Sequence, residues 1–98
     1  MSLSVVTRPP AATEIETAYR WYENERGGLG SEFLEAVDKT INAIAENPER
    51  FPVIRKDIRR ALLQRFPYGI FYRVISGHIV VIVCFHGKRN PRVWRSRA

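Results

Sequence analysis

The seven residues from Ile79 to Phe85 are all apolar, and this run limits the possible folds more than any other feature of the sequence. A membrane-spanning helix needs about 20 apolar residues, so the run is far too short to cross a bilayer. It is rich in β-branched side chains, and continuous apolar runs of this length are typical of strands that are buried on both faces. We therefore predict a strand at the centre of a sheet.

The segments before this run alternate with a period of two, as expected of strands. Residues 59–66 and residues 69–75 each place successive side chains on opposite faces, and Pro67 interrupts the pattern between them. Ser76-Gly77 supplies a tight turn into the apolar run. A further short strand, 3–7, is predicted near the N-terminus, where Pro9-Pro10 ends it.

Between these strands the apolar period is that of helices. One helix is predicted to begin at Pro9 or Pro10 and to end at Gly27-Gly28 and Gly30. A second is predicted from an N-cap at Ser31 to Asn47-Pro48. Their apolar stripes are Ile15, Ala18, Tyr19 and Tyr22 in the first helix and Phe33, Val37, Ile41 and Ile44 in the second. The short glycine-rich link predicts an antiparallel helical hairpin.

These elements predict an α+β fold. An N-terminal strand precedes a two-helix antiparallel hairpin, which packs on one face of a mainly antiparallel sheet ending in a three-strand meander. The first strand pairs at an edge of this sheet. With 98 residues the chain is long enough for one domain, 1–98, that buries about 60 to 65% of its unfolded surface.

Cysteine usage and the absence of other motifs exclude several classes of site. A single cysteine, Cys84, allows neither an intrachain disulfide nor a thiolate zinc site, which suits a reducing compartment. In its apolar strand it is interpreted as a small buried side chain rather than a nucleophile. The glycines of residues 27–30 lack the Lys-Ser/Thr of a phosphate-binding loop. We expect a cytoplasmic protein with no membrane segment, no metal and no cofactor.

The charge is divided unequally between the two halves of the chain. Residues 1–49 hold 4 basic and 9 acidic side chains, whereas residues 50–98 hold 12 basic and 1 acidic. Such asymmetry predicts an electropositive face on the part that the second half builds. That face would attract a polyanion such as nucleic acid, or an acidic protein.

Several of these segments together resemble toxins of bacterial type II toxin-antitoxin modules, and most closely the ParE-like branch of the RelE/ParE superfamily. The segments cover nearly the whole chain: the helical pair with Phe33 and Val37, then 47–52, 59–62, 66–74, 79–91 and Trp94. The resemblance implies the fold predicted above and a growth-inhibiting toxin held inactive by a cognate antitoxin. Its partners would be that acidic antitoxin and, for the ParE-like branch, DNA gyrase. A homodimer or a heterotetramer with the antitoxin is left open.

The RelE-like branch instead cleaves messenger RNA on the ribosome, and the sequence carries only part of its pattern. Stabilising the charge of the attacked phosphate needs cationic groups, together with a proton donor and acceptor. Arg60 and Arg89 match basic positions of that pattern, but Leu62 and Gly69 stand where other cations would be. The C-terminal tyrosine position falls near Trp94 or Arg95. If the chain is a nuclease, the candidate catalytic residues are His86, Arg89 and Arg60.

The remaining basic and aromatic residues of the second half are candidate contacts to a target or an antitoxin. They are Arg59, Arg65, Arg73, Lys88, Arg92 and Trp94. An antitoxin tail could lay an amphipathic helix on the helical hairpin or add a strand to an open sheet edge. A third hypothesis is a non-toxic nucleic-acid-binding module.

Overall fold

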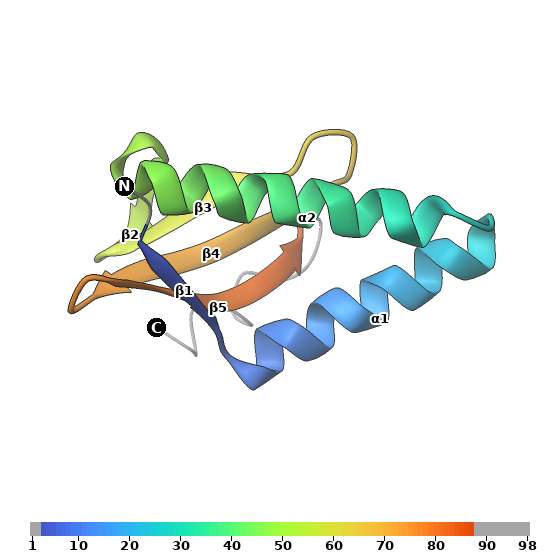
Figure 1. Ribbon diagram of the computed structural model, residues 1–98, viewed down its shortest axis with the longest axis horizontal. Coiled ribbons are helices and arrows are strands. Elements are labelled where there is room, and N and C mark those ends of the chain that lie inside the picture. Colours follow the sequence, from blue (N-terminus) through green and yellow to red (C-terminus); the bar gives the residue numbers. More distant parts are fainter. Residues whose placement is uncertain (1–2, 88–98) are drawn as a thin grey trace.

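The structure is a computed structural model that describes residues 3–87. In chain order its elements are β1 (Ser4–Thr7), α1 (Pro9–Glu25), α2 (Leu29–Glu46), a 3₁₀ turn η1 (Pro48–Arg50), β2 (Val53–Arg55), β3 (Ile58–Leu62), β4 (Tyr68–Ile75) and β5 (His78–His86). Figure 1 shows both helices on the same side of the sheet. The predicted α+β arrangement of one strand, a helical pair and a sheet is confirmed.

The sheet has the order β1-β5-β4-β3-β2. Strands β2 to β5 form an antiparallel meander, and β1 pairs with β5 in parallel at the edge. The prediction of a mainly antiparallel sheet with the first strand at an edge is therefore confirmed. The meander has one strand more than predicted, because Val53–Arg55 forms the short edge strand β2. Three residues are too few to show a period of two, so the sequence pattern missed it.

The apolar run of β5 is buried on both faces, as predicted, but β5 is not the middle strand. Ile79, Val81 and Cys84 belong to the core under the helices, whereas Ile82, Val83 and Phe85 belong to a cluster on the opposite face. A register shift opposite Phe71 and Tyr72 lets two consecutive residues of β5 join that second cluster. The middle strand is β4, because the extra strand β2 lengthens the sheet at the edge beyond β3.

Helix α2 begins three residues earlier than predicted, at Leu29, with Gly28 and not Ser31 as its N-cap. Gly28 has a φ of 90°, a conformation that glycine adopts without strain. The N–H groups that a cap must satisfy are bonded from the preceding helix: the Glu23 carboxylate accepts from Gly28 N and Gly30 N, both at 3.0 Å. A capping group seven residues away cannot be found from local cap preferences.

The strand predicted over 59–66 ends at Leu62. Residues 63–67 form a compact connection in which Arg65 has a φ of 70° and Leu63 N donates to Tyr68 O at 3.0 Å. The connection turns the side chains of Leu63 and Phe66 into the core, where each is 7% exposed. The favourable free energy of burying both side chains explains why β3 ends at Leu62, although the alternating pattern continues to Phe66.

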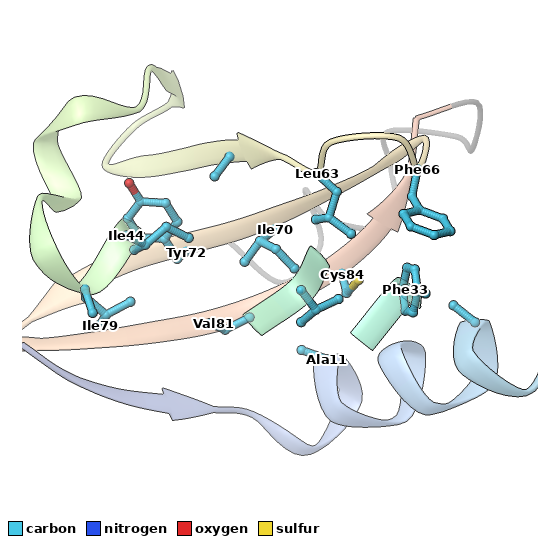
Figure 2. Close-up of a cluster of buried hydrophobic side chains, with 14 residues drawn as sticks. Ala11, Phe33, Ile44, Leu63, Phe66, Ile70, Tyr72, Ile79, Val81 and Cys84 are labelled. Atoms are coloured by element: carbon cyan, nitrogen blue, oxygen red, sulfur yellow. The ribbon is translucent and has the colours of Figure 1, made fainter. Parts of the chain in front are cut away.

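The main core lies between the helices and the sheet (Figure 2). At one end, Phe33 of α2 contacts Tyr22, Phe66 and Tyr68, with ring centroids 5.3 to 5.4 Å apart. At the other end, the fully buried Tyr72 lies beside Ile44 and Ile79, and its hydroxyl oxygen can be seen in Figure 2. This hydroxyl donates a hydrogen bond to the Pro48 carbonyl at the start of η1.

Because of Tyr72, the free energy of unfolding varies with pH in the alkaline range. Burial raises the pKa of Tyr72 from 10.0 to about 12, against a smaller lowering by Arg59. The folded state thus holds this proton more tightly than the unfolded state, so the contribution is complete below pH 10 and is lost as the pH rises toward 12. We expect Tyr72→Phe to lower the free energy of unfolding by about 1 to 3 kcal/mol at pH 8, because the Pro48 carbonyl loses its donor.

The difference in the free energy of unfolding between the wild type and Tyr72→Phe should shrink between pH 10 and pH 12. Over this range the wild type loses the phenol proton that bonds to the Pro48 carbonyl, and the variant lacks this proton at every pH. Urea denaturation of both proteins across this range measures it. Other groups that titrate there are common to the two proteins and cancel in the difference. A difference that stays constant to pH 12 would contradict the assigned role of the phenol.

Candidate functional site

The face of the sheet turned away from the helices carries a second apolar cluster, which we call the outer-face cluster. Its members are all at most 3% exposed: Ile58, Phe71, Ile82, Val83 and Phe85. On this same face lie two of the predicted site residues, Arg60 and Arg73. Arg60 stands directly opposite Phe71 in the β3-β4 register, and Arg73 follows Phe71 by two residues along β4.

The two arginines of the outer face differ in their freedom to bind a ligand. Arg60 is exposed, and its side chain lies over Gly69, where a Cβ would stand 3.3 Å from the Arg60 Cγ. Arg73 forms an ion pair with Asp57 at 2.9 Å and is 17% exposed at its side chain. Leu62, one of the two positions where the RelE-like pattern has a cation, is 64% exposed. Of the two arginines, Arg60 is the one with a solvent-exposed side chain.

Arg59 and Arg65 lie on the helix side of the sheet and are bound to groups of the fold. One guanidinium nitrogen of Arg59 donates to the carbonyls of Glu49 and Phe51, at 3.1 and 2.6 Å. Arg65 pairs with Glu32 at 2.7 Å, and its guanidinium lies 5.7 Å from the ring centroid of Phe66. The hydrogen bond from Arg65, with a second from Arg26, lowers the pKa of Glu32. The four arginines are thus divided between two faces.

A groove of about 310 Å³ lies between α2 and the end of β3, and we call it the α2 groove. Its charged residues are Glu32, Glu35, Lys39, Arg50 and Arg65, and the residues between them are small, apolar or neutral: Ala36, Thr40, Ala43, Phe51, Leu62, Gln64 and Phe66. Apolar rings flanked by exposed charges suit the side chains of an amphipathic segment of another protein.

A larger hollow of about 570 Å³, which we call the α1 groove, lies between α1 and the adjoining ends of β4 and β5. It is lined by Thr13, Glu14, Thr17, Ala18, Trp21, Tyr22, Pro67, Tyr68, Cys84 and His86. The His86 ring packs edge-on against Tyr68, with centroids 5.1 Å apart. Trp21 is 57% exposed at this groove, and it is the most exposed large aromatic side chain of the described residues.

The structure therefore does not bring His86 and Arg60 together. His86 faces the α1 groove on the helix side, whereas Arg60 lies on the outer face beside Phe71. The two side chains therefore lie on opposite faces of the sheet. The other predicted site residues, Lys88, Arg89, Arg92 and Trp94, lie outside the described residues.

Sequence reasoning missed Glu14 and Trp21, which the fold places in the α1 groove. The Glu14 carboxylate accepts the backbone N–H of Cys84 at 3.1 Å, beyond the point where β1 ends its pairing with β5 at Val81. Trp21 stands three residues after Ala18, and that spacing could have added it to the helical stripe. Nothing in the sequence around Glu14 marks it as a partner of a strand 70 residues away.

Cys84 has the environment of a structural residue. It is 1% exposed, and burial together with the negative charge of Glu14 raises its pKa to about 12. Because the thiolate is the nucleophile, we expect alkylation of the native protein at pH 8 to be about 10³-fold slower than that of the urea-unfolded chain. Mass spectrometry after timed exposure to iodoacetamide measures both rates. Native and unfolded rates within tenfold of each other would contradict the structural role.

Two kinds of feature are absent from the part of the chain that the structure describes. Residues 3–87 contain no cluster of three or more His, Cys, Asp or Glu side chains arranged to hold a metal ion. Over the same range, neither helix combines the length and the apolar character needed to span a bilayer.

Comparison with known proteins gives a family and two similar structures. The sequence model of the ParE toxin of type II toxin-antitoxin systems matches residues 5–91. A chain of the chromosomal ParDE toxin-antitoxin system of P. aeruginosa aligns with a TM-score of 0.65 and 19% identity, over 87% of this chain and 96% of that one. A chain of the RelBE2 toxin-antitoxin complex of Mycobacterium tuberculosis aligns with a TM-score of 0.61 and 15% identity, over 88% and 99%. No curated protein matches the sequence significantly.

Proposed function

This chain belongs to the ParE toxin family of type II toxin-antitoxin systems, and from that premise we propose that it arrests bacterial growth by binding DNA gyrase in the cytoplasm and is neutralised by a cognate antitoxin. The family match over residues 5–91 is the observation that carries the proposal. In this proposal the toxin acts by binding, without cutting RNA.

The separation of His86 from Arg60 supports action by binding. Cleavage of RNA needs groups that donate and accept protons on the same phosphate whose charge is stabilised. His86 and Arg60 lie on opposite sides of the sheet, and Gly69, beside Arg60 on the outer face, offers no side chain. The two candidate catalytic residues that the structure describes, His86 and Arg60, therefore do not share one site.

The role of His86 gives the sharpest test of this mechanism in cells. His86→Phe keeps a ring against Tyr68 but cannot carry a proton. We expect the variant to arrest growth as the wild type does, whereas loss of a proton-transferring residue would reduce a nuclease rate by about 10²- to 10⁴-fold. Growth curves after induction without antitoxin, with primer extension on translated transcripts, measure both. Cut transcripts with wild type and intact ones with His86→Phe would contradict the proposal.

The α2 groove is the antitoxin site in this proposal. The antitoxin tail is expected to be acidic and amphipathic, and the groove offers apolar rings beside Lys39, Arg50 and Arg65. Isothermal titration with a peptide from the neighbouring reading frame tests it. We expect Arg50→Glu to weaken binding at least about tenfold. Lys56→Glu makes the same charge change on an exposed residue outside the groove and should have little effect. Equal losses in the two variants would show only a long-range charge effect and would contradict the groove as the site.

A further inference from the structure

The α2 groove follows the axis of α2 and has two distinct ends. At one end Glu32 pairs with Arg65 at 2.7 Å. At the other end, where η1 follows α2, the Arg50 guanidinium lies 5.5 Å from the ring centroid of Phe51. Ala43, the last residue of α2 in the lining, stands eleven residues after Glu32, which corresponds to about 16 Å of helix. The groove therefore has the length of about three helical turns.

Three charged side chains of the groove are available to a partner. Glu32 and Arg65 are bound to each other. Glu35, Lys39 and Arg50 are exposed, and none of them forms an ion pair with another residue in the described part of the chain. Along the groove these three residues place one negative charge before two positive charges, and the positive charges lie toward η1.

The side of α2 that lines the groove between these charges consists of small residues. Ala36, Thr40 and Ala43 recur at steps of four and three, so they share one face of the helix. Phe51 and Phe66 add apolar rings from outside α2. Small side chains let a second helix approach α2 closely, and the large apolar side chains of that helix would fill the space beside the two rings.

The sheet offers little to an extended partner at this groove. Arg60 N already donates to Pro52 O at 3.1 Å, and β3 ends two residues later at Leu62. In the connection that follows, Arg65 has a φ of 70°, which is not a strand conformation. Among the described residues of β3, the edge beyond Arg60 is thus too short for a new strand, which needs roughly 3 to 10 residues. A partner here must satisfy its own backbone hydrogen bonds, as an α-helix does.

We infer that the α2 groove receives an amphipathic α-helix that runs antiparallel to α2, with acidic residues toward η1 and a basic residue toward Glu35. Acidic side chains stabilise a helix near its N-terminus, and basic ones near its C-terminus. Acidic residues beside Lys39 and Arg50 therefore place the N-terminus of the bound helix where η1 begins. This inference rests on the proposed function, in which the antitoxin binds the α2 groove, and adds the form and the direction of the bound segment.

A spin-labelled peptide tests the direction of the bound helix. The probe is a designed amphipathic peptide of about 18 residues, with glutamates in its first half, lysines in its second half and a nitroxide at its N-terminus. In NMR spectra of the full chain, we expect the amide signals of Ala43 and Arg50 to lose most of their intensity and that of Glu32 to lose little. A nitroxide at the C-terminus of the peptide should give the reverse pattern.

Exchange of the groove charges provides the decisive variant. Glu35→Lys together with Arg50→Glu reverses the order of the charges and leaves the net charge of the protein unchanged. The N-terminal nitroxide should then broaden the signal of Glu32 and not that of Ala43. As a matched control, Glu16→Lys with Arg20→Glu exchanges an exposed ion pair of α1 outside the groove, and the wild-type pattern should persist.

Four results would overturn the inference. They are broadening of both ends of the groove to the same extent, broadening of the Glu32 end in the wild type, a peptide that binds without gaining helix in circular dichroism, and no binding at millimolar concentration. Failure of the proposed function gives a different result. In that case the peptide from the neighbouring reading frame does not bind, or its binding does not depend on Arg50, whatever the direction of the designed helix.

Discussion

Phe33→Ala is expected to lower the free energy of unfolding by about 4 kcal/mol, the largest effect of any single substitution considered for this protein. Phe33 is 0% exposed and contacts the rings of Tyr22, Phe66 and Tyr68. These residues come from α1, α2, the β3-β4 connection and β4, so one ring joins four parts of the fold. Truncating it removes apolar burial and opens a cavity that the surrounding rigid elements cannot fill.

Domains of about this size have a total stability of 5 to 15 kcal/mol, so Phe33→Ala would remove a large share of it. Urea denaturation followed by circular dichroism measures the change. Trp21→Ala is the matched control, because it also removes an aromatic ring that contacts Tyr22, at 5.0 Å, but is 57% exposed. We expect the control to cost about 1 kcal/mol or less. Equal losses in the two variants would contradict the central place of Phe33 in the core.

Gly30→Ala is expected to destabilise the fold by about 2 kcal/mol, although alanine normally favours a helix over glycine by about 1 kcal/mol. A Cβ at position 30 would lie 2.7 Å from the Tyr19 carbonyl oxygen, 2.8 Å from the Tyr19 ring and 2.9 Å from the Glu23 carboxylate. The carbonyl belongs to the backbone of α1 and cannot turn away. The two helices must therefore separate, and the bond from Gly30 N to Glu23 is strained.

Gly27→Ala is the control for this close approach. A Cβ at position 27 meets nothing within 4 Å, and its backbone conformation does not require glycine. We expect this variant to unfold at the same urea concentration as the wild type, or slightly higher, since it restricts the unfolded chain. If Gly27→Ala and Gly30→Ala changed the free energy of unfolding equally, the loss of stability in Gly30→Ala would not come from contact between the helices.

The fold could be predicted from the sequence wherever a long periodic pattern reports burial. The stripes of α1 and α2 and the apolar run of β5 each extend over two turns of helix or several strand residues, so chance patterns do not imitate them. The start of α2 and the end of β3 could not be predicted, because a distant carboxylate, Glu23, and the burial of Phe66 decide them. Boundaries set by tertiary contacts leave no local signal.

The candidate site was harder to predict than the fold. The alternation along a strand tells which residues share a face with Arg60 or with His86, but not whether those two faces are the same face of the sheet. In β5 the register shift also changes the face on which the last residues lie. The roles of Arg59 and Arg65 depend on carbonyl and carboxylate groups of other elements. Their basic character predicts a binding surface, and the bonds that Arg59 and Arg65 make within the fold leave no signal in the local sequence.

An assay of the purified protein with purified gyrase and supercoiled plasmid tests the proposed mechanism directly. If this ParE family member acts by binding the enzyme, linear DNA should accumulate once gyrase is denatured and digested, and His86→Phe should give the same amount as wild type. Prior mixing with the antitoxin should abolish it. Plasmid that stays uncut at every toxin concentration, while transcripts on translating ribosomes are cleaved, would contradict binding of gyrase as the mechanism.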